Sequence, residues 1–246
     1  MASVDPARLA SSLLRLEPAT DLGTAQALRQ AIDACAELFQ VTGSGLLVAD
    51  QDNAMRAAAA TDGPGRVLED VQEQTGQGPC VDSFVNREIV TTDDLACEDR
   101  WPASRDILVS HGVRAVLAVP VVLGGVTVGS LNVYMDQPHR WDESEKAALG
   151  RYRELIEAML SAAAQARQSG ELADQLTYAL DYRSVIERGV GFVMASYGLN
   201  AVDAFNLLRR TARDQRRKVA DVAQELLSAG TLPRGSSPST TRRRQR

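Results

Sequence analysis

Histidine, cysteine and aromatic residues are scarce in this 246-residue chain. It has two histidines, three cysteines and 4% aromatic residues. Two histidines leave little material for a histidine-based catalytic triad or a multi-histidine metal site. Three cysteines at irregular spacing argue against a disulfide framework. We therefore expect neither an enzyme nor a metal site, and we predict no cofactor.

Long apolar runs are also missing. No run reaches the roughly 18 residues that a membrane helix needs, and residues 1–18 lack the basic start and apolar core of a secretory signal. No phosphate-binding glycine loop occurs, because Gly124, Gly125 and Gly129 belong to a predicted hairpin. With 44% hydrophobic and 24% charged residues, the chain has ordinary globular composition. We expect a cytoplasmic protein without a membrane partner.

Charge is unevenly distributed along the chain, whose formal net charge is −5. Residues 1–170 hold 14 basic and 24 acidic residues, whereas residues 171–230 hold 8 of each. Residues 231–246 hold five basic residues and no acidic one, and they are rich in Ser, Thr and Pro. This distribution predicts two domains with different partners, followed by a disordered basic tail at 231–246.

The first domain begins with a helical pattern. Apolar residues recur with the helical period over 21–39, where Asp21 is a suitable N-cap and Cys35 lies on the apolar face. Short apolar runs at 45–49 and 54–60 predict two strands. Residues 63–95 read as mostly irregular, with a brief helix and a glycine-rich turn. The brief helix is expected at Val67–Gln74 and the turn at Gly76–Cys80.

A β-hairpin is the clearest signal in this domain. Val113–Val122 and Val126–Met135 are rich in β-branched residues and are separated by Leu123-Gly124-Gly125. Helices at both ends of a mostly antiparallel sheet predict an α+β domain over 21–165. The preceding segment, 1–20, is expected to contain a fragment of helix.

Cys80 and Trp101 are the candidate ligand contacts of this domain. A thiol in a glycine-proline turn can be exposed and redox-sensitive, or can reach a bound ligand. The favoured alternative is that Cys80 is a small buried hydrophobe, as free cysteines usually are. Trp101 can line a pocket, although packing beneath its loop is the favoured interpretation.

Asp142 opens a long helix with a narrow apolar seam. The seam advances by alternating steps of three and four, which is typical of a coiled coil. Its members are Leu149, Tyr152, Ile156, Met159, Ala163 and Ala166. It weakens at Ser169-Gly170 and then resumes. We predict a homodimer through the helix at 142–185, with a hinge near Gly170. The alternative is that the alanines pack back on the sheet.

Residues 171–230 predict three short helices around one small core. The first apolar stripe comprises Leu176, Ala179, Leu180, Ile186 and Met194. Gly198 can take the left-handed conformation that ends this helix, and Asn200 is a suitable N-cap for the second. The other two stripes comprise Ala201, Ala204, Phe205 and Leu208, and then Val219, Val222, Ala223 and Leu226.

A dense basic run lies at the end of the second predicted helix. It comprises Arg209, Arg210, Arg213, Arg216, Arg217 and Lys218, with Asp214 as its only acidic residue. If the helix continues, four of these arginines share a face of about 100°. If it breaks near Asp214, the last two arginines flank the next helix. Arginine makes bidentate phosphate contacts and stacks on unpaired bases, but a solvated helix end is an equal alternative.

An ordered set of motifs resembles the GAF domain of the actinobacterial type over about 21–165. The motifs are GQGPCVDSF, IVTTDDL, RWPASRD, HGVRAVLAVPVVLGG and GSLNVYM. The resemblance implies a central antiparallel sheet with helices on one side and often a ligand pocket on the other. A small-molecule signal is then expected, although the fold does not identify it.

The C-terminal pattern resembles the ANTAR domain over 172–227. It runs through Arg183, Ile186-Glu187, Gly191, Met194, Gly198, Ala204-Phe205, Leu208-Arg209, Lys218 and Val222-Ala223. The family is a three-helix module that binds RNA hairpins in nascent transcripts and prevents termination, and a sensor domain precedes it. By resemblance, the basic run would contact RNA, with Arg183 and Arg188 as second-rank candidates.

The chain departs from the ANTAR pattern in two places. The family often has Ala-Lys-Gly where this chain has Gly189-Val190-Gly191, so a lysine is missing. By helix propensity, Gly189 costs about 1 kcal/mol against alanine. Asn is common in the family near Arg216. We expect a signal-responsive antitermination regulator; the alternative is a small-molecule-binding regulator that acts through a protein partner or duplex DNA.

Overall fold

The computed structural model describes residues 4–16, 23–50, 55–61, 63–165 and 171–233. The chain divides into two compact units, residues 1–183 and 184–246. The predicted N-cap Asp21, the hinge near Gly170 and the tail beyond residue 233 lie outside the described residues.

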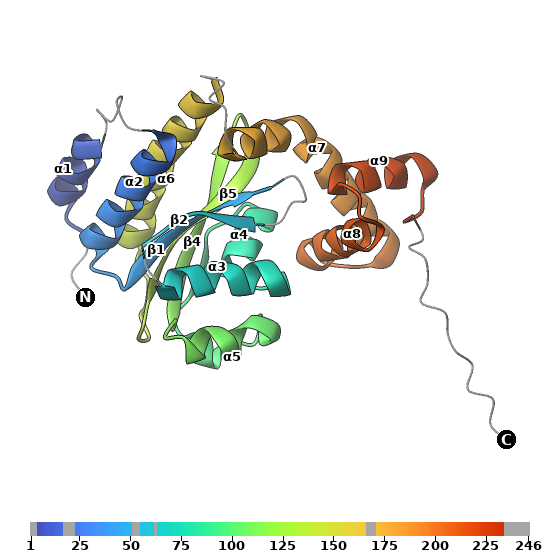
Figure 1. Cartoon of the computed structure of the whole chain (residues 1–246). Coiled ribbons are helices and arrows are strands. Elements are labelled where there is room, and N and C mark those ends of the chain that lie inside the picture. Colours follow the sequence, from blue (N-terminus) through green and yellow to red (C-terminus); the bar gives the residue numbers. More distant parts are fainter. Residues whose placement is uncertain (1–3, 17–22, 51–54, 62, 166–170, 234–246) are drawn as a thin grey trace. The chain divides into compact units, whose positions relative to one another are not determined.

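A five-stranded antiparallel sheet forms the centre of the first unit (Figure 1). Its strand order is β2(Met55–Ala60), β1(Gly43–Ala49), β5(Val126–Met135), β4(Ala115–Leu123) and β3(Val90–Thr92). The predicted hairpin is confirmed by the antiparallel pairing of β4 with β5. Gly124 and Gly125 join them with φ of 56° and 82°, the positive values that a two-residue hairpin turn requires. The α+β fold class is confirmed.

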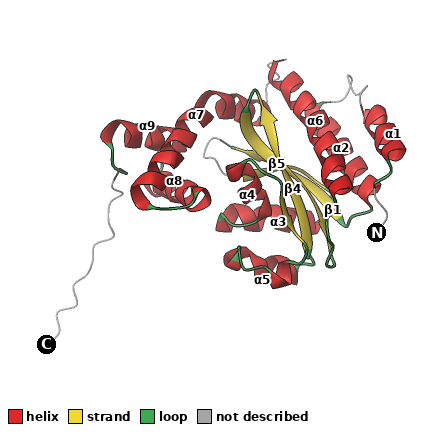
Figure 2. Cartoon of the chain, turned by 180° about the vertical axis from the view of Figure 1, so that it is seen from behind, coloured by secondary structure: helices red, strands yellow, loops and turns green. Residues whose placement is uncertain are grey.

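Helices cover both faces of this sheet, not one (Figures 1 and 2). On one face lie α2(Thr24–Phe39) and α6(Glu143–Gln165), with α1(Pro6–Leu16) beside them. On the other lie α3(Gly63–Thr75), α4(Pro79–Asn86) and α5(Pro102–Ser110). The short 3-10 helix η1(Leu95–Cys97) precedes α5.

The prediction that residues 63–95 are mostly irregular is wrong. Two helices occupy much of this stretch, and α3 is longer than the expected Val67–Gln74. Gly78-Pro79, which reads as a turn, is the start of α4. Proline is favoured in the first helical turn, where its missing N–H needs no partner. Cys80 therefore lies in a helix.

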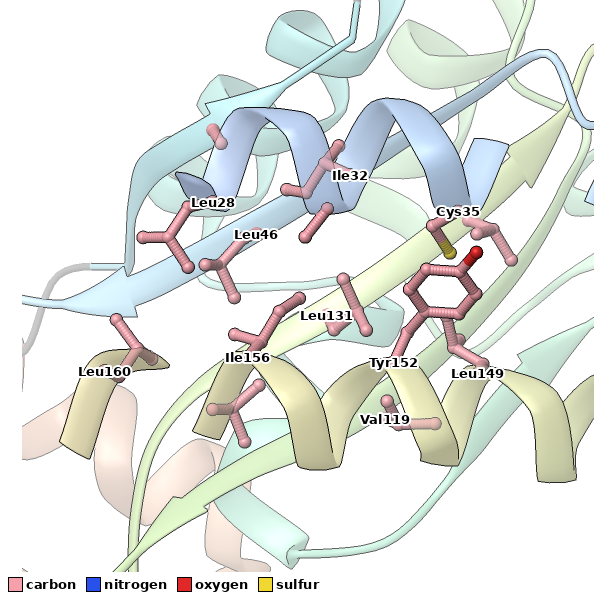
Figure 3. Packing of buried hydrophobic residues seen from close by; sticks show 14 of the residues in the cluster. Leu28, Ile32, Cys35, Leu46, Val119, Leu131, Leu149, Tyr152, Ile156 and Leu160 are labelled. Atoms are coloured by element: carbon pink, nitrogen blue, oxygen red, sulfur yellow. The ribbon is translucent and has the colours of Figure 1, made fainter. Parts of the chain in front are cut away.

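One hydrophobic core lies between the sheet and the pair α2 and α6 (Figure 3). Its central side chains are almost fully buried: Leu28, Ile32 and Cys35 from α2, Leu46, Val119 and Leu131 from the sheet, and Leu149, Tyr152, Ile156 and Leu160 from α6. Cys35 is a core residue, as predicted. The apolar seam of the long helix therefore packs within the same chain, which is the alternative in which these residues pack on the sheet. A homodimer remains a prediction, and it needs a surface other than these buried side chains.

The start of α6 shows why the long helix begins where the sequence indicates. The Asp142 carboxylate accepts from the Glu145 N–H at 2.9 Å, and the Glu145 carboxylate accepts from the Asp142 N–H at 2.8 Å. This reciprocal pair is a capping box, which satisfies backbone donors at a helix start.

Three helices follow, as predicted: α7(Glu171–Tyr197), α8(Ala201–Gln215) and α9(Val219–Ala229). The Asn200 side chain accepts from the Asp203 N–H at 2.8 Å, which confirms it as the N-cap of α8. Gly198 has a φ of 67°, as its position after α7 requires. The stripe predicted for α7 is wrong in part, because Leu180 and Met194 are 38% and 36% exposed.

Gly189 explains which face of α7 turns inward. A Cβ added there would lie 2.9 Å from the Ala223 Cβ and 3.6 Å from Leu208 Cδ1. The helices therefore approach closely at this residue, with Ile186 and Val193 buried one turn away on either side. Helix propensity predicts that alanine at Gly189 would stabilise the protein, and this prediction is wrong because the alanine methyl group would crowd α9.

Candidate nucleic-acid interface and sensor interior

The basic run spans the end of α8 and the link to α9. Arg216 adopts a left-handed conformation, with φ 53° and ψ 45°, and the Arg217 N–H donates to the Ala212 carbonyl at 2.9 Å. These features end α8 at Gln215 in a Schellman motif. Of the two alternatives for the basic run, the helix break is therefore the one that occurs. Asn tolerates this conformation better than arginine does.

Three arginines lie on α8 itself. Arg210 and Arg213 are exposed, are three residues apart and make no ion pair with the part of the chain that the structure describes. Residues at this spacing are neighbours on a helix surface. The Arg209 guanidinium lies 5.6 Å from the centre of the Phe205 ring, a cation–π contact that holds it partly buried.

The link between α8 and α9 contributes the other three cations. Arg216 and Lys218 are exposed. Arg217 is half-buried: its Nη1 donates to Glu225 Oε2 at 2.6 Å and to Gln215 Oε1 at 3.2 Å. Arg217 thus ties the link to α9, which makes it a positioning residue in this arrangement. We call these four exposed cations, Arg210, Arg213, Arg216 and Lys218, the basic ridge.

The two second-rank candidates differ in exposure. Arg188 is exposed on α7, next to Gly189 at the contact with Leu208. That contact places Arg188 near the middle of α8, where Leu208 lies. Arg183 is only 4% exposed, and its guanidinium lies 4.1 Å from the centre of the Phe84 ring in the first unit. The assignment of Arg183 to a surface contact does not fit this burial.

Cys80 is fully buried, so of the two interpretations left open by the sequence the exposed thiol does not occur. Its N–H donates to Gln72 Oε1 at 2.8 Å. Burial raises the pKa of the Cys80 thiol to about 12, so the thiol stays protonated at neutral pH. Only the thiolate is strongly nucleophilic, and Cys80 is therefore the buried small hydrophobe that the sequence favoured.

Trp101 is 2% exposed and packs in a second core on the α3 and α5 side of the sheet. Its indole N–H donates to Asp82 Oδ2 at 2.9 Å. The Arg100 guanidinium lies over the ring at 4.2 Å. These contacts agree with packing beneath the loop, the interpretation favoured from the sequence.

Sequence reasoning missed two buried polar residues on the same side of the sheet. Glu69 on α3 and Asn132 on β5 are each 1% exposed, and no side-chain oxygen or nitrogen of either has a hydrogen-bond partner among the described residues. They meet over Gly45: a Cβ there would collide with the Glu69 carboxyl and lie 3.2 Å from Asn132 Nδ2. We call Glu69 and Asn132 the interior polar pair.

The pKa of Glu69 is raised to about 9, chiefly by burial and also by the nearby Asp70, while Arg66 acts in the opposite direction. The carboxyl is therefore neutral at pH 7. A signal for this site exists in the sequence, because Gly65, Leu68, Glu69 and Gln72 share one helical face. The acidic residues next to Glu69 in the sequence instead predict that this face is exposed to solvent.

No group of three or more His, Cys, Asp and Glu side chains could hold a metal ion within the described part of the chain. None of the helices described there is long and apolar enough to cross a membrane.

Two family models match this chain. The model of the GAF domain matches residues 21–167, and that of the ANTAR domain matches residues 174–227. A search of curated proteins found no match.

Solved structures are similar to the first of these regions. A GAF domain from an Acinetobacter phosphoenolpyruvate-protein phosphotransferase has 16% identity and a TM-score of 0.55, covering 68% of this chain and 98% of its own. The free methionine-R-sulfoxide reductase from Neisseria meningitidis, in complex with its substrate, has 18% identity and a TM-score of 0.53, covering 68% and 97%. At such identities the likeness shows the fold alone.

Proposed function

This chain belongs to the GAF domain family, and from that premise we propose that it is a signal-responsive regulator whose ANTAR domain binds hairpin RNA in nascent transcripts and prevents termination. The observation that carries the proposal is the basic ridge, which lies on the outside of a three-helix bundle matched by the ANTAR model. Both domains are regulatory modules, and we propose no catalytic role. Action on nascent transcripts implies a cytoplasmic location.

The basic ridge suits a folded RNA. Guanidinium groups make bidentate contacts with phosphates and stack on unpaired bases, which hairpin loops present. Each phosphate that is neutralised releases counterions, so the logarithm of the affinity falls by about 0.7 to 0.9 per decade of salt for each contact. Four contacts would give a slope of about −3. Arg209, held on Phe205, and Arg188 extend the same charge.

Duplex DNA is the rival nucleic-acid partner. A helix-turn-helix module inserts one helix into the major groove with the N-terminal residues of that helix on the bases. The first turn of α8 instead carries Asp203, and two cations of the ridge, Arg216 and Lys218, lie beyond the helix end. This arrangement favours binding to the curved phosphate backbone of a folded RNA over insertion into one groove of a DNA duplex. A protein partner, the other rival, predicts no salt-dependent affinity for RNA.

The signal-receiving part of the sensor is proposed to lie at the interior polar pair. Buried polar groups are almost always hydrogen-bonded, so the unpaired atoms of Glu69 and Asn132 are suited to a small molecule with hydrogen-bonding groups. Cys80 and Trp101 are packed against other protein groups and are weaker candidates.

A homodimer remains part of the proposal. Because Leu149, Tyr152 and Ile156 of α6 are buried in the first unit, another part of the helices between 142 and 185 has to pair. Leu180 and Tyr182 on α7 are 38% and 45% exposed and offer such a surface.

The test compares hairpin RNA with duplex DNA by fluorescence anisotropy at several salt concentrations. We expect the full chain to prefer hairpin RNA and the double variant R210A/R213A to lose most of that affinity. The matched control is R8A/R29A, which removes two exposed arginines from the first unit and should bind as the wild type does. Preference for duplex DNA, or equal losses in both variants, would contradict the proposal.

A further inference from the structure

Helix α8 carries the uncharged amide of Asn206 on the same helical face as its exposed arginines. Asn206 lies four residues before Arg210 and seven before Arg213, within one uninterrupted helix. At about 100° per residue, the three side chains fall within about 60° of arc. Arg210 and Arg213 are exposed and Asn206 is partly exposed. The amide is therefore part of the surface that the basic ridge presents.

The other uncharged polar side chains of α8 lie on other faces of the helix. The Thr211 hydroxyl, which donates to the Leu207 carbonyl at 2.9 Å, lies about 140° from Asn206 around the helix. The Gln215 amide donates to the Pro233 carbonyl at 2.8 Å and lies about 180° from Asn206 around the helix. Among the side chains of α8, Asn206 is thus the amide that accompanies the two exposed arginines.

An amide can do what the arginines cannot. Contacts with phosphates position a protein on a nucleic acid but carry no sequence information. A side-chain amide has two N–H donors and a carbonyl oxygen with two lone pairs, so one contact inside the protein leaves further capacity. This pairing of donor and acceptor matches base edges, adenine above all, and the bases of an RNA loop expose their edges.

We propose that Asn206 reads the edge of an unpaired loop base while Arg210 and Arg213 hold the neighbouring phosphates. This inference rests on the proposed function, because it requires that the basic ridge binds hairpin RNA. It assigns discrimination between loop sequences to Asn206 and general affinity to the arginines.

The experiment uses the full chain and a pool of RNA hairpins with a fixed stem and a randomised loop, with bound RNA identified by sequencing. We expect the wild type to enrich a preferred base at one loop position. N206A should flatten that preference by roughly tenfold without changing the salt slope. N206Q, which moves the amide by one methylene, should change the preference as well. R213A should keep the preference and lower the slope.

The matched control is Q224A, which removes an exposed amide from α9 and should leave the loop profile intact. Circular dichroism shows whether each variant is folded. An unchanged loop profile in folded N206A, while the wild type binds with salt-dependent affinity, overturns this inference and leaves the proposed function standing. No salt-dependent hairpin binding by the wild type contradicts both.

Discussion

Replacing Glu69 with glutamine should stabilise the first unit at neutral pH. The pKa of this carboxyl is raised from 4.5 to about 9, chiefly by burial. The folded state therefore holds a proton that the unfolded state releases above about pH 4.5, so the free energy of unfolding falls as pH rises from 4.5 toward 9. Between pH 4.5 and 7 the loss is at most about 3 kcal/mol, at 1.36 kcal/mol per pH unit. Glutamine has nearly the same shape and no proton to lose.

The assay is urea unfolding followed by tryptophan fluorescence, since Trp101 and Trp141 both lie in the first unit. E69Q should exceed the wild type by roughly 1–3 kcal/mol at pH 7 and match it near pH 4. E88Q, which removes an exposed carboxyl, serves as the control and should follow the wild type. An E69Q variant that tracks the wild type at every pH would refute the claim that this carboxyl is buried and neutral.

Three further experiments test other parts of the structure. R213A/K218A should weaken hairpin binding roughly 100-fold and lower the salt slope by about 1.5; an unchanged slope in fluorescence anisotropy would remove both residues from the interface. G189A should destabilise the bundle by about 1–3 kcal/mol through overpacking. G191A, where a Cβ meets nothing within 4 Å, should instead raise the free energy of unfolding by about 0.5–1 kcal/mol. Urea titrations that rank the two variants in the opposite order would contradict the close helix approach. Cys80 should react with iodoacetamide at pH 7.5 only after unfolding, and rapid labelling seen by mass spectrometry would contradict its burial.

Local patterns in the sequence predicted the elements whose cause is local. The hairpin depends on β-branched runs around Gly124-Gly125, and both glycines have the positive φ that the turn requires. Asn200 caps α8 as its position indicates. Arg210 and Arg213 of α8 are exposed because the apolar residues of the same helix occupy other sides of it.

Features that depend on tertiary packing could not be predicted in this way. The seam of α6 has the spacing of a coiled coil, yet its partner is the sheet of the same chain, and spacing cannot distinguish the two. From the sequence, Arg183 is expected at the surface, but in the structure it packs on Phe84, which is distant in sequence. Glu69 reads as part of an acidic run, although its helical face points to the sheet. From the sequence, Gly189 is expected to destabilise its helix, but in the structure the close approach of α9 leaves no room for a larger side chain.

Antitermination is the central claim, and a purified transcription assay tests it most directly. The template carries, upstream of an intrinsic terminator and overlapping it, the hairpin that the wild type enriches most strongly from the pool. The wild-type chain should increase the fraction of transcripts that read through the terminator, and R210A/R213A should leave that fraction at its value without protein. Equal read-through with and without a wild-type chain that is bound to the hairpin would contradict the account.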